Sequence, residues 1–172
     1  MARIIFAAIH YPKMDTLTLA RVLHVLAVVL WIGGVAMVTL VIIPAIKKLK
    51  SKEERLHTFE KIEGRFALQA KIWTLLAGIT GFYMLYVLDG WQCYLYLEYW
   101  WIHAMTLVWL LFTVMLFFLE PFVLHRLFRK KAMQNPQKTF RVLNRLHWVL
   151  LFLSLLTIAG AVAGSHGWFW VR

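Results

Sequence analysis

The chain has 172 residues, of which 62% are hydrophobic and 16% are charged. Soluble globular domains are nearer half apolar and a quarter charged, so this composition excludes an ordinary water-soluble domain and indicates an integral membrane protein. The net charge of +11 would raise the question of nucleic acid in a soluble chain. The single cysteine, Cys93, excludes an internal disulfide and any cysteine-based zinc or iron–sulfur site within one chain.

Four apolar stretches are long enough to cross a bilayer as helices, which takes about 20 residues for a hydrocarbon core of roughly 30 Å. They lie near residues 17–46, 66–88, 100–124 and 146–171. The expected fold is therefore an all-α integral membrane protein. It is a bundle of four transmembrane helices in which residues 1–172 form a single membrane domain.

The basic residues concentrate in two of the connections between these helices. The 47–65 and 125–145 connections each hold seven Lys or Arg residues, and the 89–99 connection holds none. Because short cytoplasmic connections collect Lys and Arg, both termini are predicted outside, which in a bacterium means the periplasmic side of the inner membrane. The positive charge is then a signal of topology, and no nucleic acid partner is expected.

Both basic connections carry signals for the start of a helix. Ser51 followed by Glu54 is typical of a capping box, and Asn135 followed by Pro136 combines a capping residue with proline at the first turn. Each connection is therefore predicted to extend the following membrane helix toward the cytoplasm.

The chain repeats a pattern of residues at a spacing of about 80. Either chance matches of common residues or two helical hairpins of the same direction would produce this pattern. We expect the second, with the hairpins related by a pseudo-twofold axis along the membrane normal. The repeated pairs are His24 and His103, Pro44 and Pro121, Thr58-Phe59 and Thr139-Phe140, and Leu76-Ala77-Gly78 and Ile158-Ala159-Gly160.

Three histidines are predicted to share one layer in the outer half of the membrane. His24 and His103 lie roughly 5–10 Å below the outer boundary at 1.5 Å per helical residue, and His166 lies in the same layer. Under the repeat, His24 and His103 face each other across the central axis. Polar groups at this depth are costly and are functional candidates by default.

Two opposed imidazoles in an apolar bundle match the needs of a b-type haem, whose iron takes axial ligands above and below the macrocycle. We therefore predict His24 and His103 as the axial ligands. Ala27 leaves room for the ring, Trp31 packs against it, and Arg21 pairs with a propionate. The alternatives are structural histidines that join helices by hydrogen bonds, and a copper site.

The residues around His24 also resemble a known group of membrane proteins. Leu23-His24-Val25-Leu26-Ala27, followed by Trp31-Ile32-Gly33-Gly34, resembles the first membrane helix of the CopD family of copper-resistance proteins and of the related HemJ-type protoporphyrinogen oxidases. Trp101-Ile102-His103 is similar to the HemJ pattern Trp-Leu-His-x-Lys, and Arg21 and Asn144 also match residues of that type. The resemblance covers the four-helix core and implies a protein that handles haem or copper.

Two positions depart from the HemJ pattern. The lysine expected two residues after His103 is Met105, and the glutamate expected after Asn144 is Arg145. The resemblance therefore implies haem binding more than porphyrinogen oxidation. CopD-like copper handling would need Met and His clustered at the outer face, whereas the methionines of this chain are scattered along the helices.

A second set of polar residues lies toward the inner side. Glu120 precedes Pro121, His125 ends the third helix, His147 opens the fourth, and Lys71 lies about a turn into the second. The expected role is interfacial packing, with Glu120 paired to Lys71 or to an inner arginine. A quinone or proton site, or a second haem on His125 and His147, is the alternative.

The expected function is one-electron transfer between a membrane-soluble carrier such as quinol and a partner at the outer face. The protein would act by itself, as a homo-oligomer or as a subunit of a larger redox complex. HemJ-like porphyrinogen oxidation and CopD-like copper handling are the competing functions. His166 is a further candidate, either as a replacement axial ligand or as an outer quinone contact.

Overall fold

The computed structural model describes the backbone of residues 2–168 and the side chains of residues 15–51, 53–120 and 130–168. Residues 2–168 contain no strand. Within this described part, four helices are long and apolar enough to cross a membrane, namely Asp15–Lys47, Glu53–Val87, Leu97–Glu120 and Pro136–Ser165. The predicted set of four apolar helices is confirmed, and it is compatible with an integral membrane protein.

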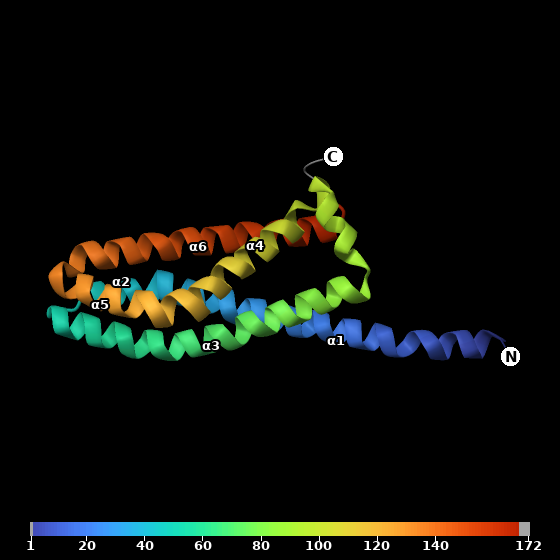
Figure 1. Ribbon diagram of the computed structural model, residues 1–172, viewed down its shortest axis with the longest axis horizontal. Helices are drawn as coiled ribbons and strands as arrows, with labels where there is room; N and C mark the ends of the chain where they lie inside the picture. Colours follow the sequence, from blue (N-terminus) through green and yellow to red (C-terminus); the bar gives the residue numbers. More distant parts are fainter. Residues whose placement is uncertain (1, 169–172) are drawn as a thin grey trace.

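The first hairpin consists of a segmented rod followed by one long helix. α1 (Ala2–Met37), η1 (Val38–Ile42) and α2 (Ile43–Lys47) form the rod, and α3 (Lys52–Val87) returns beside α1 (Figure 1). Ser51 caps α3, because its hydroxyl oxygen accepts a hydrogen bond of 3.1 Å from the N–H of Glu54. The predicted cap is confirmed.

The second hairpin has the same order of parts. The 3₁₀ turns η2 (Gly90–Leu95) and η3 (Leu97–Tyr99) lead into the second rod, and α6 returns beside it. Asn135 caps α6, since its side-chain oxygen accepts a hydrogen bond of 3.1 Å from the N–H of Lys138. The rod consists of α4 (Trp100–Val114), η4 (Met115–Leu124) and α5 (His125–Gln134), and α6 spans Pro136–Ser165.

The helices differ from the predicted spans mainly at their starts. α3 and α6 begin within the basic connections, as the capping signals predict, and not at residues 66 and 146, where the apolar stretches begin. α6 ends at Ser165. The final residues of the predicted 146–171 span lie outside the described residues.

A π-helical stretch lies beside the proline of each rod. η1 immediately precedes the segment that contains Pro44, and η4 contains Pro121. Proline has no N–H for the i→i−4 ladder. The N–H of Ile43 bonds to the carbonyl of Val38, five residues back, so the first rod continues through its proline as a wider turn.

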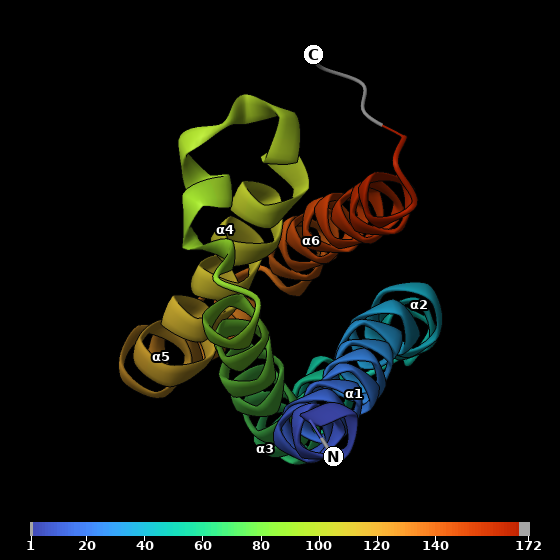
Figure 2. The ribbon, with the colours of Figure 1, turned by 90° about the vertical axis from the view of Figure 1, so that its right-hand side faces the viewer.

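The four long helices form a ring when viewed along the long axis of the molecule (Figure 2). α3 has α1 and α4 as neighbours, and α6 has α4 and α1 as neighbours, so α1 lies diagonally opposite α4. α1 and α3 make the most extensive contact. α1 begins and α6 ends at the same end of the molecule (Figure 1), which we call the histidine end, and the opposite end, with α2, α5 and the turns at residues 48–51 and 135, is the basic end.

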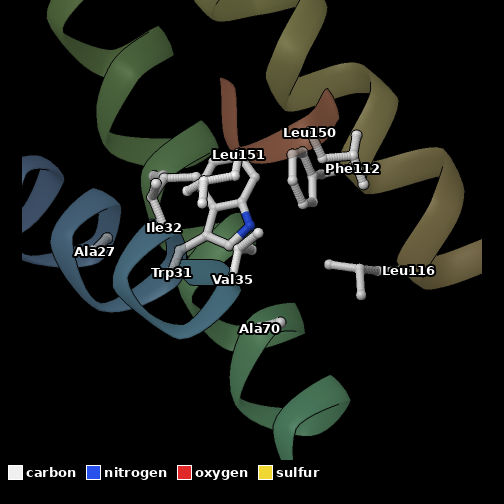
Figure 3. Packing of buried hydrophobic residues seen from close by; sticks show 10 residues of the cluster. Ala27, Trp31, Ile32, Val35, Ala70, Phe112, Leu116, Leu150 and Leu151 are labelled. Atoms are coloured by element: carbon white, nitrogen blue, oxygen red, sulfur yellow. The ribbon is translucent and has the colours of Figure 1, made fainter. Parts of the chain in front are cut away.

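Two buried clusters hold the ring together. In the larger one, Trp31 of α1 meets Phe112 of α4 edge to face, with ring centroids 4.8 Å apart, and leucines of α6 cover them (Figure 3). In the smaller one, at the basic end, Phe59 of α3 and Phe140 of α6 meet edge to face at 5.6 Å. His24 and His103 therefore lie on the side of the larger cluster that faces the histidine end.

Candidate functional site

His24 lies on α1 and faces α3. Its Nδ1 is 2.9 Å from the carbonyl oxygen of Ala77 and 3.1 Å from the hydroxyl oxygen of Thr80. The Thr80 hydroxyl donates its own hydrogen to the carbonyl of Leu76 at 2.6 Å, so both neighbours of Nδ1 act as acceptors. In a neutral ring Nδ1 therefore carries the proton and Nε2 keeps its lone pair. No described residue makes a hydrogen bond to Nε2 of His24.

Small residues bring α3 close to this imidazole. A Cβ atom on Gly81 would lie 3.2 Å from Cε1 of His24, so glycine permits the approach. Ala27, one turn further along α1, has an exposed fraction of 0% and belongs to the cluster that contains Ala77 of α3. The space that the sequence assigns to a macrocycle beside Ala27 is thus filled by α3.

His103 is held by the connection that precedes its own helix. Its Nε2 is 3.1 Å from the carbonyl oxygen of Tyr94, and its Nδ1 is 3.3 Å from that of Tyr99. A neutral imidazole has one N–H, so it can donate to only one of the two carbonyls. The ring also meets the Tyr94 ring edge to face, with centroids 5.3 Å apart. In this arrangement His103 does not face His24.

Tyr94 is itself fixed by a series of aromatic contacts. Trp109 of α4 meets Phe82 of α3 at 5.3 Å, Phe82 stacks on Trp91 at 6.2 Å, and Trp91 stacks on Tyr94 at 6.4 Å. Trp109 also donates from Nε1 to the carbonyl of Thr74 at 2.9 Å. The 90–99 connection is therefore attached to the α3–α4 pair, and it carries the contacts of His103 with it.

A groove of about 390 Å³ opens beside His103. Two of its lining residues, Tyr94 and Thr106, have hydroxyl groups that bond to each other at 2.6 Å. The surface of the groove is almost wholly apolar, and His24 is not part of it. The lining residues are Tyr94, His103, Ala104, Thr106, Leu107 and Leu110.

The other residues predicted for the outer site lie apart from one another. His166 is exposed, and its Nδ1 is 2.8 Å from the carbonyl of Val162 in its own helix. Arg21 is exposed. Trp31 is only 4% exposed, and its Nε1 has no hydrogen-bond partner within the described part of the chain. In Figure 3 this nitrogen lies on the side of the indole that faces Phe112.

The inner polar residues do include a pair in contact. Nζ of Lys71 lies 2.8 Å from Oε2 of Glu120, and the two side chains are 27% and 24% exposed. The predicted pairing of Glu120 with Lys71 is confirmed. Glu63 lies within electrostatic range of Glu120, although the sequence analysis did not single it out. Its position two helical turns before Lys71 on α3 is the signal that could have identified it.

The two inner histidines do not join this pair. Nδ1 of His147 is 3.0 Å from the carbonyl of Leu143 in the same helix. The side chain of His125 lies outside the described residues. Thr80 and Gly81, which contact His24, were also missed by the sequence analysis, since nothing in the sequence marks which face of α3 meets α1.

Comparison with protein-family models, with curated proteins and with solved structures finds no match for this chain. In the described part of the chain, no three His, Cys, Asp or Glu side chains gather in a group that could hold a metal ion.

Proposed function

We propose that the protein binds a b-type haem toward the histidine end, with Nε2 of His24 as an axial ligand, and transfers single electrons. The observation that carries the proposal is the state of His24. Its Nδ1–H is engaged by Ala77 and Thr80, and its Nε2 has no hydrogen bond among the residues whose side chains the structure describes. Metal-ligating histidines characteristically donate the other ring N–H to a carbonyl or similar acceptor, which fixes both tautomer and ring orientation.

The imidazole of His24 is suited to bind haem iron through Nε2, and the imidazole of His103 is less suited. Iron takes a neutral imidazole nitrogen, which His24 offers as it stands. Both ring nitrogens of His103 face the carbonyls of Tyr94 and Tyr99. His103 would serve as a second ligand only if its Nε2 released the carbonyl oxygen of Tyr94. We therefore propose His24 as the main iron ligand and His103 as the second. His166, whose Nδ1 is engaged within its own helix, is the replacement ligand.

Arg21 and the groove beside His103 supply two further parts of the proposal. A bound haem b supplies one-electron Fe(III)/Fe(II) chemistry. The exposed guanidinium of Arg21, one turn from His24, is the candidate partner for a propionate. The groove beside His103 has an almost wholly apolar surface, and we assign it to a quinol or quinone as the redox partner of the protein.

We also propose that the molecule is built from two repeated hairpins related by a pseudo-twofold axis. The π-helical stretches η1 and η4 occur at corresponding positions, and both returning helices begin at a side-chain cap. Phe59 and Phe140, which the repeat makes equivalent, contact each other, as equivalent residues do on a twofold axis. The two basic connections support cytoplasmic placement of the basic end, with both termini periplasmic in a bacterial inner membrane.

The absorption spectrum of the purified protein tests the haem proposal. The protein is expressed with a haem precursor, purified in detergent, and measured oxidised and after reduction with dithionite. We expect a low-spin haem b spectrum that is lost in His24→Ala and weakened or converted to high spin in His103→Ala. The control is His147→Ala, whose imidazole bonds only within its own helix and which should retain the spectrum.

Each other outcome points to a different function. A colourless wild-type protein, or His24→Ala with an unchanged spectrum, would refute the proposal. A colourless protein that retains copper through dialysis would favour the CopD-like alternative. Turnover of porphyrinogen would favour the HemJ-like one. A protein that folds normally and retains neither haem nor copper would make His24 a structural link between α1 and α3.

A further inference from the structure

A second groove runs along the surface of the α1–α3 pair toward the basic end. It has a volume of about 520 Å³ and is bounded by residues within Val29–Ile42 of the first rod, which belong to α1 and η1, and by residues within Lys61–Gln69 of α3. A Cβ atom on Gly33 would have nothing within 4 Å, so the groove is open at that point. At Gly34 the absent side chain lets the Phe66 ring approach the backbone of α1 and form the floor.

Two cations line the end of this groove on α3. Lys61 and Arg65 are one helical turn apart, and both are exposed. Neither makes an ion pair with any residue whose side chain the structure describes. Gln69 continues the same face one turn deeper and adds an amide group to the lining.

Glu63, the acidic residue that lies between the two cations in sequence, is on the other side of α3. Successive helical residues are rotated by about 100°, so Glu63 is about 200° around the helix from both Lys61 and Arg65. Glu63 is within electrostatic range of Glu120, which in turn pairs with Lys71 at 2.8 Å. The Glu63 carboxylate is therefore turned toward η4, and Lys61 and Arg65 give the polar end of the groove its positive charge.

The length and polarity of the groove match one leaflet of a bilayer. The wall formed by the first rod covers 13 steps of 1.5 Å, or about 20 Å, whereas half of a hydrocarbon core of roughly 30 Å is about 15 Å. The cations of the groove lie on the side of the basic end, where the lipid headgroups of that leaflet begin. Apolar side chains of the first rod line the remainder, namely Val29, Leu30, Met37, Val38 and Ile42.

We propose that this groove binds one anionic phospholipid from the leaflet at the basic end. Lys61 and Arg65 bind the phosphate, and an acyl chain lies along α1 over Gly33. Lys61 and Arg65 are not ion-paired with any residue whose side chain the structure describes, the apolar part of the groove has the depth of one leaflet, and the groove is open at Gly33. Together these features fit a ligand that has an anionic headgroup and an acyl chain. The proposal concerns the opposite end of the molecule from His24 and does not depend on haem.

Lipid binding is measured by native mass spectrometry of the detergent-purified protein titrated with phosphatidylglycerol or phosphatidylcholine of the same acyl chains. We expect tighter binding of phosphatidylglycerol. Lys61→Ala/Arg65→Ala should weaken it about fivefold for each cation removed. Gly33→Leu, which fills open space and leaves the helix contacts intact, should weaken binding of both lipids by occluding the groove.

The matched control is Arg141→Ala/Arg145→Ala. These arginines are exposed on α6, have the same spacing of four residues, and change the net charge by the same amount. Equal loss of binding in this control would overturn the proposal, because it would show a general effect of surface charge. Equal affinity for the two lipids, or full competition by inorganic phosphate with no effect of Gly33→Leu, would also overturn it.

Discussion

The two ends of the molecule are held together in different ways. At the basic end, equivalent parts of the two hairpins contact each other through Phe59 and Phe140. Nearer the middle of the molecule, Lys71 on α3 pairs with Glu120 on η4. At the histidine end, His24 bonds to α3 within the first hairpin, and His103 bonds to the connection just before its own helix. Neither histidine links one hairpin to the other.

This difference shows which side chains join the hairpins at each end. Contacts between hairpins at the basic end fix the relative position of α3 and α6. Toward the histidine end the links are aromatic, because Phe82 of α3 meets the ring of Trp109 on α4, which also donates to the carbonyl of Thr74.

The largest expected effect concerns the ion pair. Glu120→Ala leaves Lys71 unpaired and should lower the free energy of unfolding by about 3 kcal/mol, because an uncompensated charge in apolar surroundings is costly. The double variant Lys71→Ala/Glu120→Ala removes both charges and should be more stable than either single variant. Unfolding by sodium dodecyl sulfate in mixed micelles measures the three differences. Additive losses would mean that the ion pair contributes nothing to holding the two hairpins together.

A smaller effect is expected where α4 and α6 meet at the histidine end. Gly160→Ala places a Cβ atom into the ring of Trp100, so we expect a loss of about 2 kcal/mol from overpacking. Gly33→Ala is the control, since its Cβ atom meets open space and alanine is the better helix former. The same unfolding assay applies. If Gly160→Ala is as stable as Gly33→Ala, the histidine end is looser than described.

The smallest effect concerns the hydrogen bond between α1 and α3. Thr80→Val removes one acceptor of the His24 Nδ1–H and should cost about 0.6 kcal/mol, the usual size for a bond between membrane helices. Thr113→Val removes a hydroxyl that donates only to Trp109 in the same helix, and should change stability less. Equal changes in thermal unfolding would show that the His24 contact adds nothing to the first hairpin.

The sequence predicts the parts of this fold that depend on local pattern. The apolar spans, the caps at Ser51 and Asn135 and the pairing of Lys71 with Glu120 follow from composition, capping chemistry and the cost of a lone charge in a membrane. The direction of each imidazole does not follow, because it depends on how the helices are rotated about their axes. That rotation is set by close packing at Gly81 and Ala27, whose partners on the neighbouring helix no spacing within the sequence reveals.

The π-helical stretch at Val38–Ile42 also determines how the side chains of α2 are rotated about the axis of the first rod relative to those of α1. A wider turn delays the rotation of every later side chain relative to an unbroken α-helix. Deleting one residue from this stretch would restore ordinary α-helical turns and leave the parts of the rod on its two sides in nearly the same relative rotation, because the wider turn accommodates one extra residue. Deleting one residue between Trp31 and this stretch would instead rotate Ile43 and Ile46, now buried against the Phe59 cluster, by about 100° relative to Trp31.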